Sequence, residues 1–264
     1  MSAGSLQGPA ALIRRVAADA RGAGLFLDFD GTIAAITGNP EESRLPEPLH
    51  DVLADLSRAL GVVAVVSGRP AASLAERVPV DGVRLLGLYG LETWDDDRSR
   101  PRPEAARWQA TVDDAKRLLA AGADGLEGVE LEDKGLSVAL HWRHAADRDE
   151  RGRQVADVVE RVAAQTGLGR ELGKFVEELR PPVDWDKGTA VRAVVDEQRL
   201  RLPVYAGDDL GDLPALRAVR ELGGVAVVVS DGETPEALDE AADVTMDGPE
   251  AMADWLRGLR DALA

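Results

Sequence analysis

Leu25-Phe26-Leu27 is a short apolar run that leads directly into Asp28-Phe29-Asp30-Gly31-Thr32. An apolar run that ends in turn residues is typical of a buried parallel strand and the loop at its carboxyl end. The chain repeats this form. Three more predicted strands lead into small, polar or acidic loops: 62–66 before Ser67-Gly68-Arg69, 83–86 before the loop 87–92, and 203–206 before Gly207-Asp208-Asp209.

Helical patterns alternate with these strands. Strands that alternate with helices imply crossover units and a parallel sheet. We therefore predict an α/β fold with a doubly wound, Rossmann-like parallel-sheet core. Helices are predicted over 6–20, 46–60, 71–77, 187–197, 213–222, 235–241 and 249–259, and two further strands over 225–229 and 244–246.

The pattern changes in the middle of the chain. Residues 95–103 are charged, contain two prolines and predict a linker. We expect a core of residues 1–97 and 180–264, and an inserted α+β cap domain of residues 98–179. Within the cap we predict helices over 104–121 and 147–166, and hairpins formed by 129–132 with 136–143 and by 170–172 with 174–180.

The composition narrows the functional classes. The chain has 264 residues and a net charge of −17, so it repels nucleic acid and anionic membranes, and a phosphate site must be locally positive. The absence of cysteine excludes disulfides and thiol chemistry, and three histidines argue against a His-rich zinc site. Residues 1–9 lack a signal-peptide pattern, and no apolar stretch approaches the roughly 20 residues that span a bilayer. We expect a cytoplasmic monomer without nucleic-acid or membrane partners.

The polar strand ends carry residues that suit phosphoryl transfer. Ligands of open parallel sheets bind at the carboxyl ends of the strands, where Asp28, Asp30 and Asp208 should meet. Mg²⁺ accepts carboxylate and carbonyl oxygens, and would neutralise a phosphoryl group so that a carboxylate can attack phosphorus. Gly31 would let the phosphate approach. The donors expected for the phosphoryl oxygens are Thr32, Ser67 and Lys187.

Each of these motifs also has a plainer interpretation when it is taken alone. The motif that begins at Asp28 is compatible with an ordinary turn, and Ser67-Gly68-Arg69 with a helix N-cap. The segment from Gly207 is compatible with a loop, and Lys187 with a surface lysine. Their joint placement at strand ends favours one functional site.

Taken in order, the four motifs resemble those of the haloacid dehalogenase superfamily: Asp28-Phe29-Asp30-Gly31-Thr32, Ser67-Gly68-Arg69, Lys187 and Gly207-Asp208-Asp209. The inserted cap is similar to that of the sugar-phosphatase branch. Within this branch the chain most resembles the trehalose-6-phosphate phosphatases, from about Leu25 to Met246. The resemblance implies a phosphorylated sugar as substrate.

The resemblance also implies roles for single residues. Asp28 would be the nucleophile that forms an aspartyl-phosphate, and Asp30 the general acid for the leaving sugar oxygen and then the base for water. Mg²⁺ would be held by Asp28, the backbone carbonyl of Asp30, and Asp208. Ser67 and Lys187 would hold the phosphoryl group. The residues expected to support the metal site are Asp209 and Asp212.

Weaker features point to the sugar. The loop 87–92 is similar to the family's glycine-x-histidine-glycine loop but has Tyr89 where histidine is usual, and Leu210 to Pro214 replace the family's acidic continuation. A solvated or salt-bridged strand face would equally explain the charged cap residues. The residues expected to bind substrate are Gly31, Thr32, Arg69, Tyr89, Gly90 and Glu92 in the core, and Lys134, Arg143, Glu178 and Arg180 in the cap.

The activity that the resemblance implies is hydrolysis of trehalose 6-phosphate to trehalose and phosphate. Another phosphorylated sugar is the main alternative, such as sucrose phosphate, a glycosyl-glycerate phosphate or a pseudo-disaccharide intermediate of a natural-product pathway. A phosphomutase is a further option. A binding module that lost catalysis is disfavoured because Asp28, Asp30, Lys187 and Asp208 are all present, and a nucleotide-binding oxidoreductase because no Gly-x-Gly-x-x-Gly follows the first strand.

Overall fold

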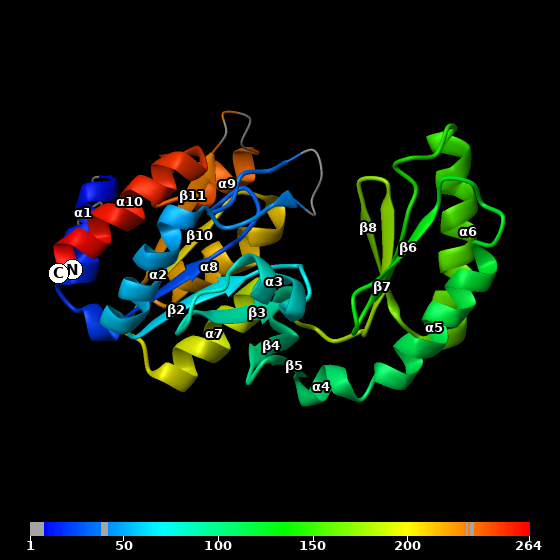
Figure 1. Ribbon diagram of the computed structural model, residues 1–264, viewed down its shortest axis with the longest axis horizontal. Helices are drawn as coiled ribbons and strands as arrows, with labels where there is room; N and C mark the ends of the chain where they lie inside the picture. The colour runs from blue at the N-terminus through cyan, green and yellow to red at the C-terminus, as the bar shows by residue number, and fades with distance from the viewer. Residues whose placement is uncertain (1–7, 38–41, 231, 233–234) are drawn as a thin grey trace. The chain divides into compact units, whose positions relative to one another are not determined.

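Figure 1 shows the computed structural model, which describes residues 8–37, 42–230, 232 and 235–264. The chain divides into two compact units. One unit, here called the core unit, combines Met1–Arg100 with Trp185–Ala264, and the other, the cap unit, is Pro101–Asp184. The boundaries lie three and five residues later than those expected from the sequence, because residues 98–100 remain with the core and 180–184 with the cap.

The core unit is built on a twisted sheet whose order, over the described residues, is β12-β11-β10-β1-β2-β3-β4-β5. The first six strands of this order pair in parallel, and β4 runs antiparallel to β3. The strands are β1 (Ala23–Leu27), β2 (Val62–Val66), β3 (Arg84–Gly87), β4 (Glu92–Asp95), β5 (Arg98–Pro101), β10 (Leu202–Gly207), β11 (Val225–Ser230) and β12 (Val244–Asp247).

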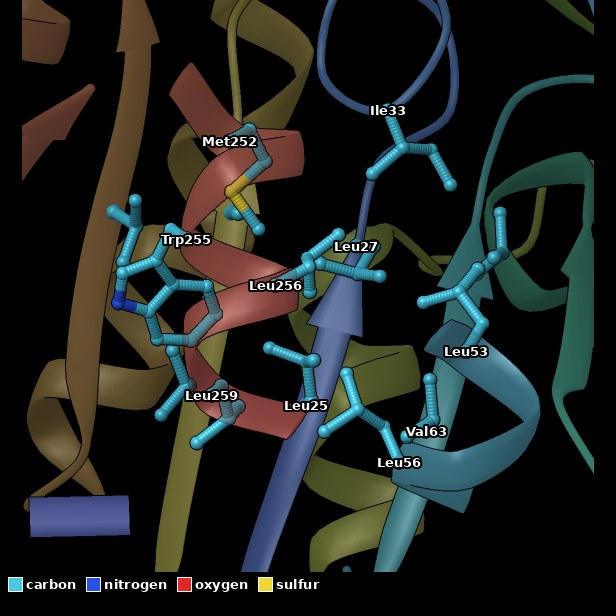
Figure 2. Packing of buried hydrophobic residues seen from close by; sticks show 14 of the residues in the cluster. Leu25, Leu27, Ile33, Leu53, Leu56, Val63, Met252, Trp255, Leu256 and Leu259 are labelled. Carbon is cyan, nitrogen blue, oxygen red and sulfur yellow. The ribbon is translucent and has the colours of Figure 1, made fainter. Parts of the chain in front are cut away.

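Helices cover both faces of this sheet. On β1, Leu25 and Leu27 point to one face and Phe26 to the other, and all three are buried. One face packs against α1 (Pro9–Ala17), α2 (Glu47–Ala59), α3 (Ala71–Arg77) and α10 (Gly248–Leu263), as Figure 2 shows for part of the cluster. The opposite face packs against α7 (Lys187–Gln198), α8 (Leu213–Glu221) and α9 (Glu236–Ala241). The predicted doubly wound α/β core is confirmed.

The cap unit is an antiparallel sheet of order β6-β7-β9-β8, backed by helices on one face. Val138, Leu140 and Leu179 of the sheet pack with apolar residues of the two long helices. Asp147 caps one of these helices by accepting from the Glu150 N–H at 2.9 Å. The elements are α4 (Pro103–Ala106), α5 (Gln109–Gly122), β6 (Glu130–Asp133), β7 (Val138–His141), α6 (Arg148–Thr166), β8 (Gly169–Gly173) and β9 (Val176–Arg180).

The charged segment expected to be a linker is instead a hairpin at the edge of the core sheet. Strands β4 and β5 are joined by Asp96 and Asp97, which both have positive φ (48° and 56°), the combination that suits a tight hairpin turn. Arg100 pairs with Asp95 at 2.7 Å across it. The hairpin was not predicted from the sequence, because neither strand shows alternating apolar residues. Among the described residues, 3₁₀ turns occur at Ala20–Gly22, Leu88–Gly90 and Leu210–Asp212.

Two further expectations concern the chain's start and its relation to membranes. The helix predicted from residue 6 is described from Pro9, and residues 1–7 lie outside the described part of the chain. Among the described helices, none combines the length and the apolar character needed to cross a membrane.

Truncation of Leu256 should destabilise the core unit. This α10 side chain is fully buried beside Leu25 and Leu27 of β1. Leu256→Ala should therefore lower the free energy of unfolding by about 2–5 kcal/mol, measured by urea denaturation followed by circular dichroism. Leu172→Ala is the control, because Leu172 is 74% exposed. A loss for Leu256→Ala no larger than that of the control would contradict the packing of α10.

Candidate active site

The sheet topology brings the four sequence motifs to one edge. The chain leaves β1 toward β2 on one side and returns to β10 on the other, so β1 lies at the switch point where ligands of such sheets bind. Leu27, the last residue of β1, lies opposite Ala206 of β10 and Val65 of β2. The loops that begin with Asp28, Ser67 and Asp208 therefore start side by side.

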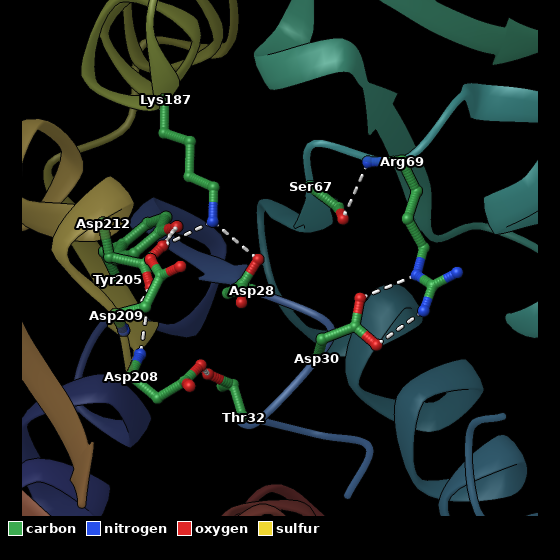
Figure 3. A network of polar contacts seen from close by, with 10 residues as sticks. All are labelled: Asp28, Asp30, Thr32, Ser67, Arg69, Lys187, Tyr205, Asp208, Asp209 and Asp212. Carbon is green, nitrogen blue, oxygen red and sulfur yellow. Dashed lines mark hydrogen bonds and ion pairs between the residues drawn. The ribbon is translucent and has the colours of Figure 1, made fainter. Parts of the chain in front are cut away.

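Lys187, the first residue of α7, connects two of these loops. Its Nζ donates to Asp28 Oδ1 and to Asp212 Oδ1, both at 2.7 Å (Figure 3). Lys187 and Asp28 are buried, and Asp212 is completely so. Charges removed from water in this way are tolerated only when they are paired and hydrogen-bonded. Lys187 was expected to hold a phosphoryl group; in this structure its ammonium group binds Asp28 and Asp212.

Asp212 fixes the conformation of the loop that begins with Asp208, using both of its carboxylate oxygens. Oδ1 also accepts from the Tyr205 hydroxyl at 2.5 Å, and Oδ2 accepts from the backbone N–H groups of Asp208 and Asp209 at 3.0 and 3.1 Å. Gly207 leaves room for this carboxylate, because a Cβ there would lie 2.3 Å from Asp212 Cγ. Asp212 is therefore a positioning residue whose oxygens are already engaged.

Tyr205 is a site residue that the sequence analysis missed. It is completely buried on β10, and its hydroxyl reaches the carboxylate that Lys187 also binds. The available signal was a single hydroxyl-bearing side chain in an otherwise apolar strand that ends at the fourth motif.

Asp28 and Asp208 provide the oxygens that a cation could use. Each of Asp28, Asp208 and Asp212 has a carboxylate oxygen within 4.8 Å of the others. The Thr32 hydroxyl donates to Asp208 Oδ1 at 3.0 Å, so Thr32 orients this carboxylate instead of remaining free for a phosphoryl group. Gly31 has φ +83°, and a Cβ there would lie 2.1 Å from Asp208 Oδ2. Gly31 was expected to let a phosphate approach; in this structure the group that lies close to it is the Asp208 carboxylate.

The electrostatics of this cluster favour a bound cation. Burial raises the pKa of Asp28 well above its usual value, and the charges of Asp212 and Asp208 add to this effect against the attraction of Lys187. Burial and the charge of Asp212 raise the pKa of Asp208 to about 7. Burial alone would lower the pKa of Lys187, but Asp28 and Asp212 reverse this and raise it. Negative charge exceeds positive charge here, and hard carboxylate oxygens suit Mg²⁺, so the donor set fits such an ion.

Asp30 is held apart from this cluster. Arg69 binds it with two parallel hydrogen bonds, Nε to Oδ2 at 2.7 Å and Nη2 to Oδ1 at 2.8 Å. Figure 3 shows the Asp30 carboxylate directed toward Arg69 and not toward Asp28. Ser67 accepts from the Arg69 N–H through Oγ at 3.2 Å. Arg69, expected to bind substrate, therefore positions Asp30 in this structure.

The loop 87–92 is shaped by backbone contacts with the second motif. Tyr89 has left-handed φ/ψ angles (60°, 22°), unusual for a side chain of this size, and its N–H donates to the Ser67 carbonyl at 2.8 Å. Its ring lies against Gly68, where a Cβ would come within 2.9 Å of the Tyr89 hydroxyl oxygen. Tyr89 is only partly buried. Strain of this kind is concentrated at functional sites.

Two other residues of this loop have roles in packing. Gly90 has φ +90°, and a Cβ there would lie 2.4 Å from the Ala190 Cβ, so glycine lets α7 approach. Glu92 is buried and accepts from the Ala71 N–H at 2.6 Å and from the Ser99 hydroxyl. Glu92 thus caps the start of α3 and does not present a free carboxylate to a ligand.

Three of the predicted cap residues share one face of the cap sheet, and Arg143 lies elsewhere. Lys134 Nζ and Glu178 Oε2 form an ion pair at 2.6 Å. Arg180 pairs with Glu171 at 3.0 Å. Arg143 is exposed and lies beyond the end of β7, whereas Lys134 lies before its start. The remaining predicted metal residue, Asp209, is an exposed residue that caps the 3₁₀ turn Leu210–Asp212.

Comparisons with known proteins identify the family of this chain. The profile of the trehalose-phosphatase family matches residues 26–249. A trehalose-phosphate phosphatase of Mycobacterium marinum is 34% identical over 91% of this chain, and an uncharacterized glycosyl hydrolase of Mycobacterium tuberculosis is 39% identical over 79% of it. The chain spans 62% of the first protein and 16% of the second.

A solved structure supports the fold. The crystal structure of a trehalose-6-phosphate phosphatase related protein superposes with a TM-score of 0.76 at 24% identity, covering 90% of this chain and 97% of the other. Together with the match of the family profile over most of the chain, these findings show that the chain belongs to the trehalose-phosphatase family.

Proposed function

We propose that this chain is a Mg²⁺-dependent phosphatase that hydrolyses trehalose 6-phosphate to trehalose and phosphate through an aspartyl-phosphate on Asp28. The observation that carries the proposal is the buried Asp28–Lys187–Asp212 arrangement beside Asp208, at the switch point of the sheet. Membership of the trehalose-phosphatase family supports the choice of substrate.

The first step would be attack by Asp28 on the phosphorus atom. Lys187 binds Oδ1 of Asp28, and no described residue donates to Oδ2, which is therefore the oxygen proposed to attack. As the O–P bond forms, the bond between phosphorus and the sugar oxygen breaks. The Ser67 hydroxyl, which accepts from the Arg69 N–H, still has its proton available for a phosphoryl oxygen.

Asp30 would give its proton to the departing sugar oxygen and later take one from the attacking water. Water then attacks phosphorus, which releases phosphate and regenerates the Asp28 carboxylate. Arg69 occupies both carboxylate oxygens of Asp30, so Asp30 must move off Arg69 to reach a leaving oxygen. We infer that Arg69 holds Asp30 in a resting position.

Asp28, Asp208 and the backbone carbonyl of Asp30 are the groups proposed to hold Mg²⁺, with Asp209 and Asp212 as outer support. The ion would supply positive charge that neutralises the phosphoryl group. The pKa values of Asp28 and Asp208 are raised because burial and neighbouring carboxylates disfavour their charged forms, and a nearby cation would favour those forms.

The cap unit is the proposed sugar-recognition domain. Lys134 and Glu178 already lie together, and they offer both a donor and an acceptor to sugar hydroxyls. Tyr89, which stands where the family usually has histidine, favours a second candidate: a phosphatase for another phosphorylated sugar. The partly exposed, strained Tyr89 is the specific observation behind this alternative.

The first test is phosphate release with Mg²⁺ from a panel of sugar phosphates. We expect trehalose 6-phosphate to be the best substrate by kcat/KM. Asp28→Asn should lower turnover by at least about a thousand-fold, because the amide cannot form the acyl phosphate. Circular dichroism should show an unchanged fold. Preference for another sugar phosphate would select the second candidate, and residual activity near wild type would exclude Asp28 as nucleophile.

Asp30→Asn should discriminate between leaving groups. A sugar oxygen needs a proton when it departs, whereas p-nitrophenolate leaves without one. We therefore expect the variant to be slowed by about 10²–10⁴-fold with trehalose 6-phosphate and much less in the burst of p-nitrophenol from p-nitrophenyl phosphate. Equal losses of the first step with both substrates would contradict the role of Asp30 as general acid.

Asp208→Asn should stabilise the metal-free protein at about pH 8. The folded-state pKa of about 7 exceeds the ordinary 3.8, so the folded state retains a proton that the unfolded state loses. This stabilising contribution is complete below about pH 4 and is lost as pH rises through 7, with an upper limit of about 4 kcal/mol because the side chain is partly exposed. In EDTA, the Tm of the variant should therefore fall less than that of wild type between about pH 5 and pH 8.

The control for this experiment is Asp124→Asn, since Asp124 is exposed in the cap unit. Added Mg²⁺ should raise the Tm of the wild type and of the control but not that of Asp208→Asn. Parallel Tm curves for all three proteins in EDTA would show that Asp208 is not a crowded carboxylate.

A further inference from the structure

The face of the cap sheet that points away from α5 and α6 carries two buried small side chains, Ser137 and Ala139, here called the floor. Ala139 on β7 lies opposite Glu132 of β6 and Glu178 of β9. Its neighbours Val138 and Leu140 point to the helices, so Ala139 points to the other face. Ala139 is nevertheless fully buried and is not part of the cluster under the helices. Something on the polar face must cover it.

The Lys134–Glu178 ion pair crosses β7 at this position. Lys134 directly follows β6 and Glu178 belongs to β9, while β7 lies between these two strands. Adjacent strands are about 4.8 Å apart, so side chains that meet must together span roughly 10 Å across β7. The 2.6 Å contact between Nζ and Oε2 closes this span. The ion pair is therefore a strap over the small residues of β7.

Ser137 lies under the same strap and has an unused hydroxyl. Val138 is opposite Asp133 and Leu179, so the preceding Ser137 faces Lys134 and Arg180. The Ser137 carbonyl accepts from the Lys134 N–H at 3.1 Å. Its side chain is 2% exposed, and among the described residues none forms a hydrogen bond with its Oγ. A buried hydroxyl without a partner carries a desolvation cost, which the free protein would avoid with alanine.

We propose that the strap opens to admit a sugar ring, and that Ser137 is a specificity-determining residue whose hydroxyl then bonds to a hydroxyl of that ring. The inference rests on the proposed phosphatase function and adds a residue and a movement to it. When the strap opens, the bond between Lys134 and Glu178 is lost, while Glu132 stays 3.7 Å from Lys134. Sugar hydroxyls both donate and accept, so one ring can bond to both side chains.

The charges of this face select an uncharged ring. Glu132 binds His141 at 2.7 Å and lies 3.7 Å from Lys134, and Glu171 stands opposite Glu178. These three glutamates outnumber Lys134 and Arg180, which pair with two of them, so a phosphate group would meet an excess of negative charge here. The ligand of the floor is therefore the unphosphorylated ring of a disaccharide phosphate.

The test compares Ser137→Ala with Ser43→Ala. Ser43 in the core unit is the matched control, because it is also buried and its Oγ also lacks a hydrogen-bond partner among the described residues. For Ser137→Ala we expect kcat/KM for trehalose 6-phosphate to fall about 2- to 10-fold, the value of one neutral hydrogen bond, with no change for p-nitrophenyl phosphate. Its Tm should be equal to or above that of wild type. Ser43→Ala should leave both kcat/KM values unchanged.

A binding measurement separates this inference from the proposed activity. Trehalose itself, titrated calorimetrically into the 264-residue chain, should bind the wild type and Ser43→Ala alike, and Ser137→Ala about 2- to 10-fold more weakly. If trehalose 6-phosphate is not hydrolysed, the proposed activity fails, and weaker trehalose binding by Ser137→Ala still supports the floor. Unchanged trehalose binding by Ser137→Ala, a loss shared equally by p-nitrophenyl phosphate, or no binding of trehalose by the wild type would overturn the inference.

Discussion

One buried ammonium group organises the active-site edge of the core unit. Lys187 is the shared donor for Asp28 at the end of β1 and Asp212 after β10, so three segments distant in sequence depend on one charge. Removing one partner of a buried ion pair typically costs about 3–5 kcal/mol, because the remaining charge is left uncompensated. Asp212 extends this constraint, since its second oxygen fixes the backbone that carries Asp208. The position of Asp28, the proposed nucleophile, and that of Asp208, the proposed metal ligand, are thus coupled through Asp212, a residue with no proposed chemical step.

The arrangement separates two kinds of carboxylate. Asp28 and Asp208 share a crowded, partly uncompensated environment that raises both pKa values, whereas Asp30 has its own guanidinium partner in Arg69. The first environment favours a cation and the second keeps an acid–base group apart until it is required. A chain with a net charge of −17 still needs a local positive field to receive a phosphate ester. Lys187 and Arg69, together with a cation held by the proposed metal ligands, would supply that field.

The sequence predicted the doubly wound core and the convergence of Asp28, Lys187 and Asp208, because apolar strands and their polar ends are local patterns. It did not predict which partner each side chain takes. Asp28 and Lys187 are 159 residues apart, and Tyr205, Glu92 and Arg69 acquire their roles only through packing. Glu92 was expected to bind substrate. In the structure it accepts from the Ala71 N–H at the start of α3, a contact between residues 21 apart that no local sequence pattern indicates. The hairpin of β4 and β5 was missed for a related reason: its turn depends on two aspartates in left-handed conformations, and its strands lack an apolar alternation.

Both units hold polar side chains ready through internal pairs. In the core, Arg69 occupies Asp30; in the cap, Lys134 occupies Glu178. A ligand that replaces such a pair gains only the difference between the new bonds and the old ones, so these contacts limit affinity. They also raise selectivity, because a ligand that satisfies only one member of the pair leaves the other unpaired at a cost of about 1–3 kcal/mol or more. A sugar with correctly placed hydroxyls would satisfy both members of the cap pair, which a phosphate ester without a second ring could not reach. If the proposed function holds, the same pairs that keep polar side chains in order without a ligand would favour a complete disaccharide phosphate.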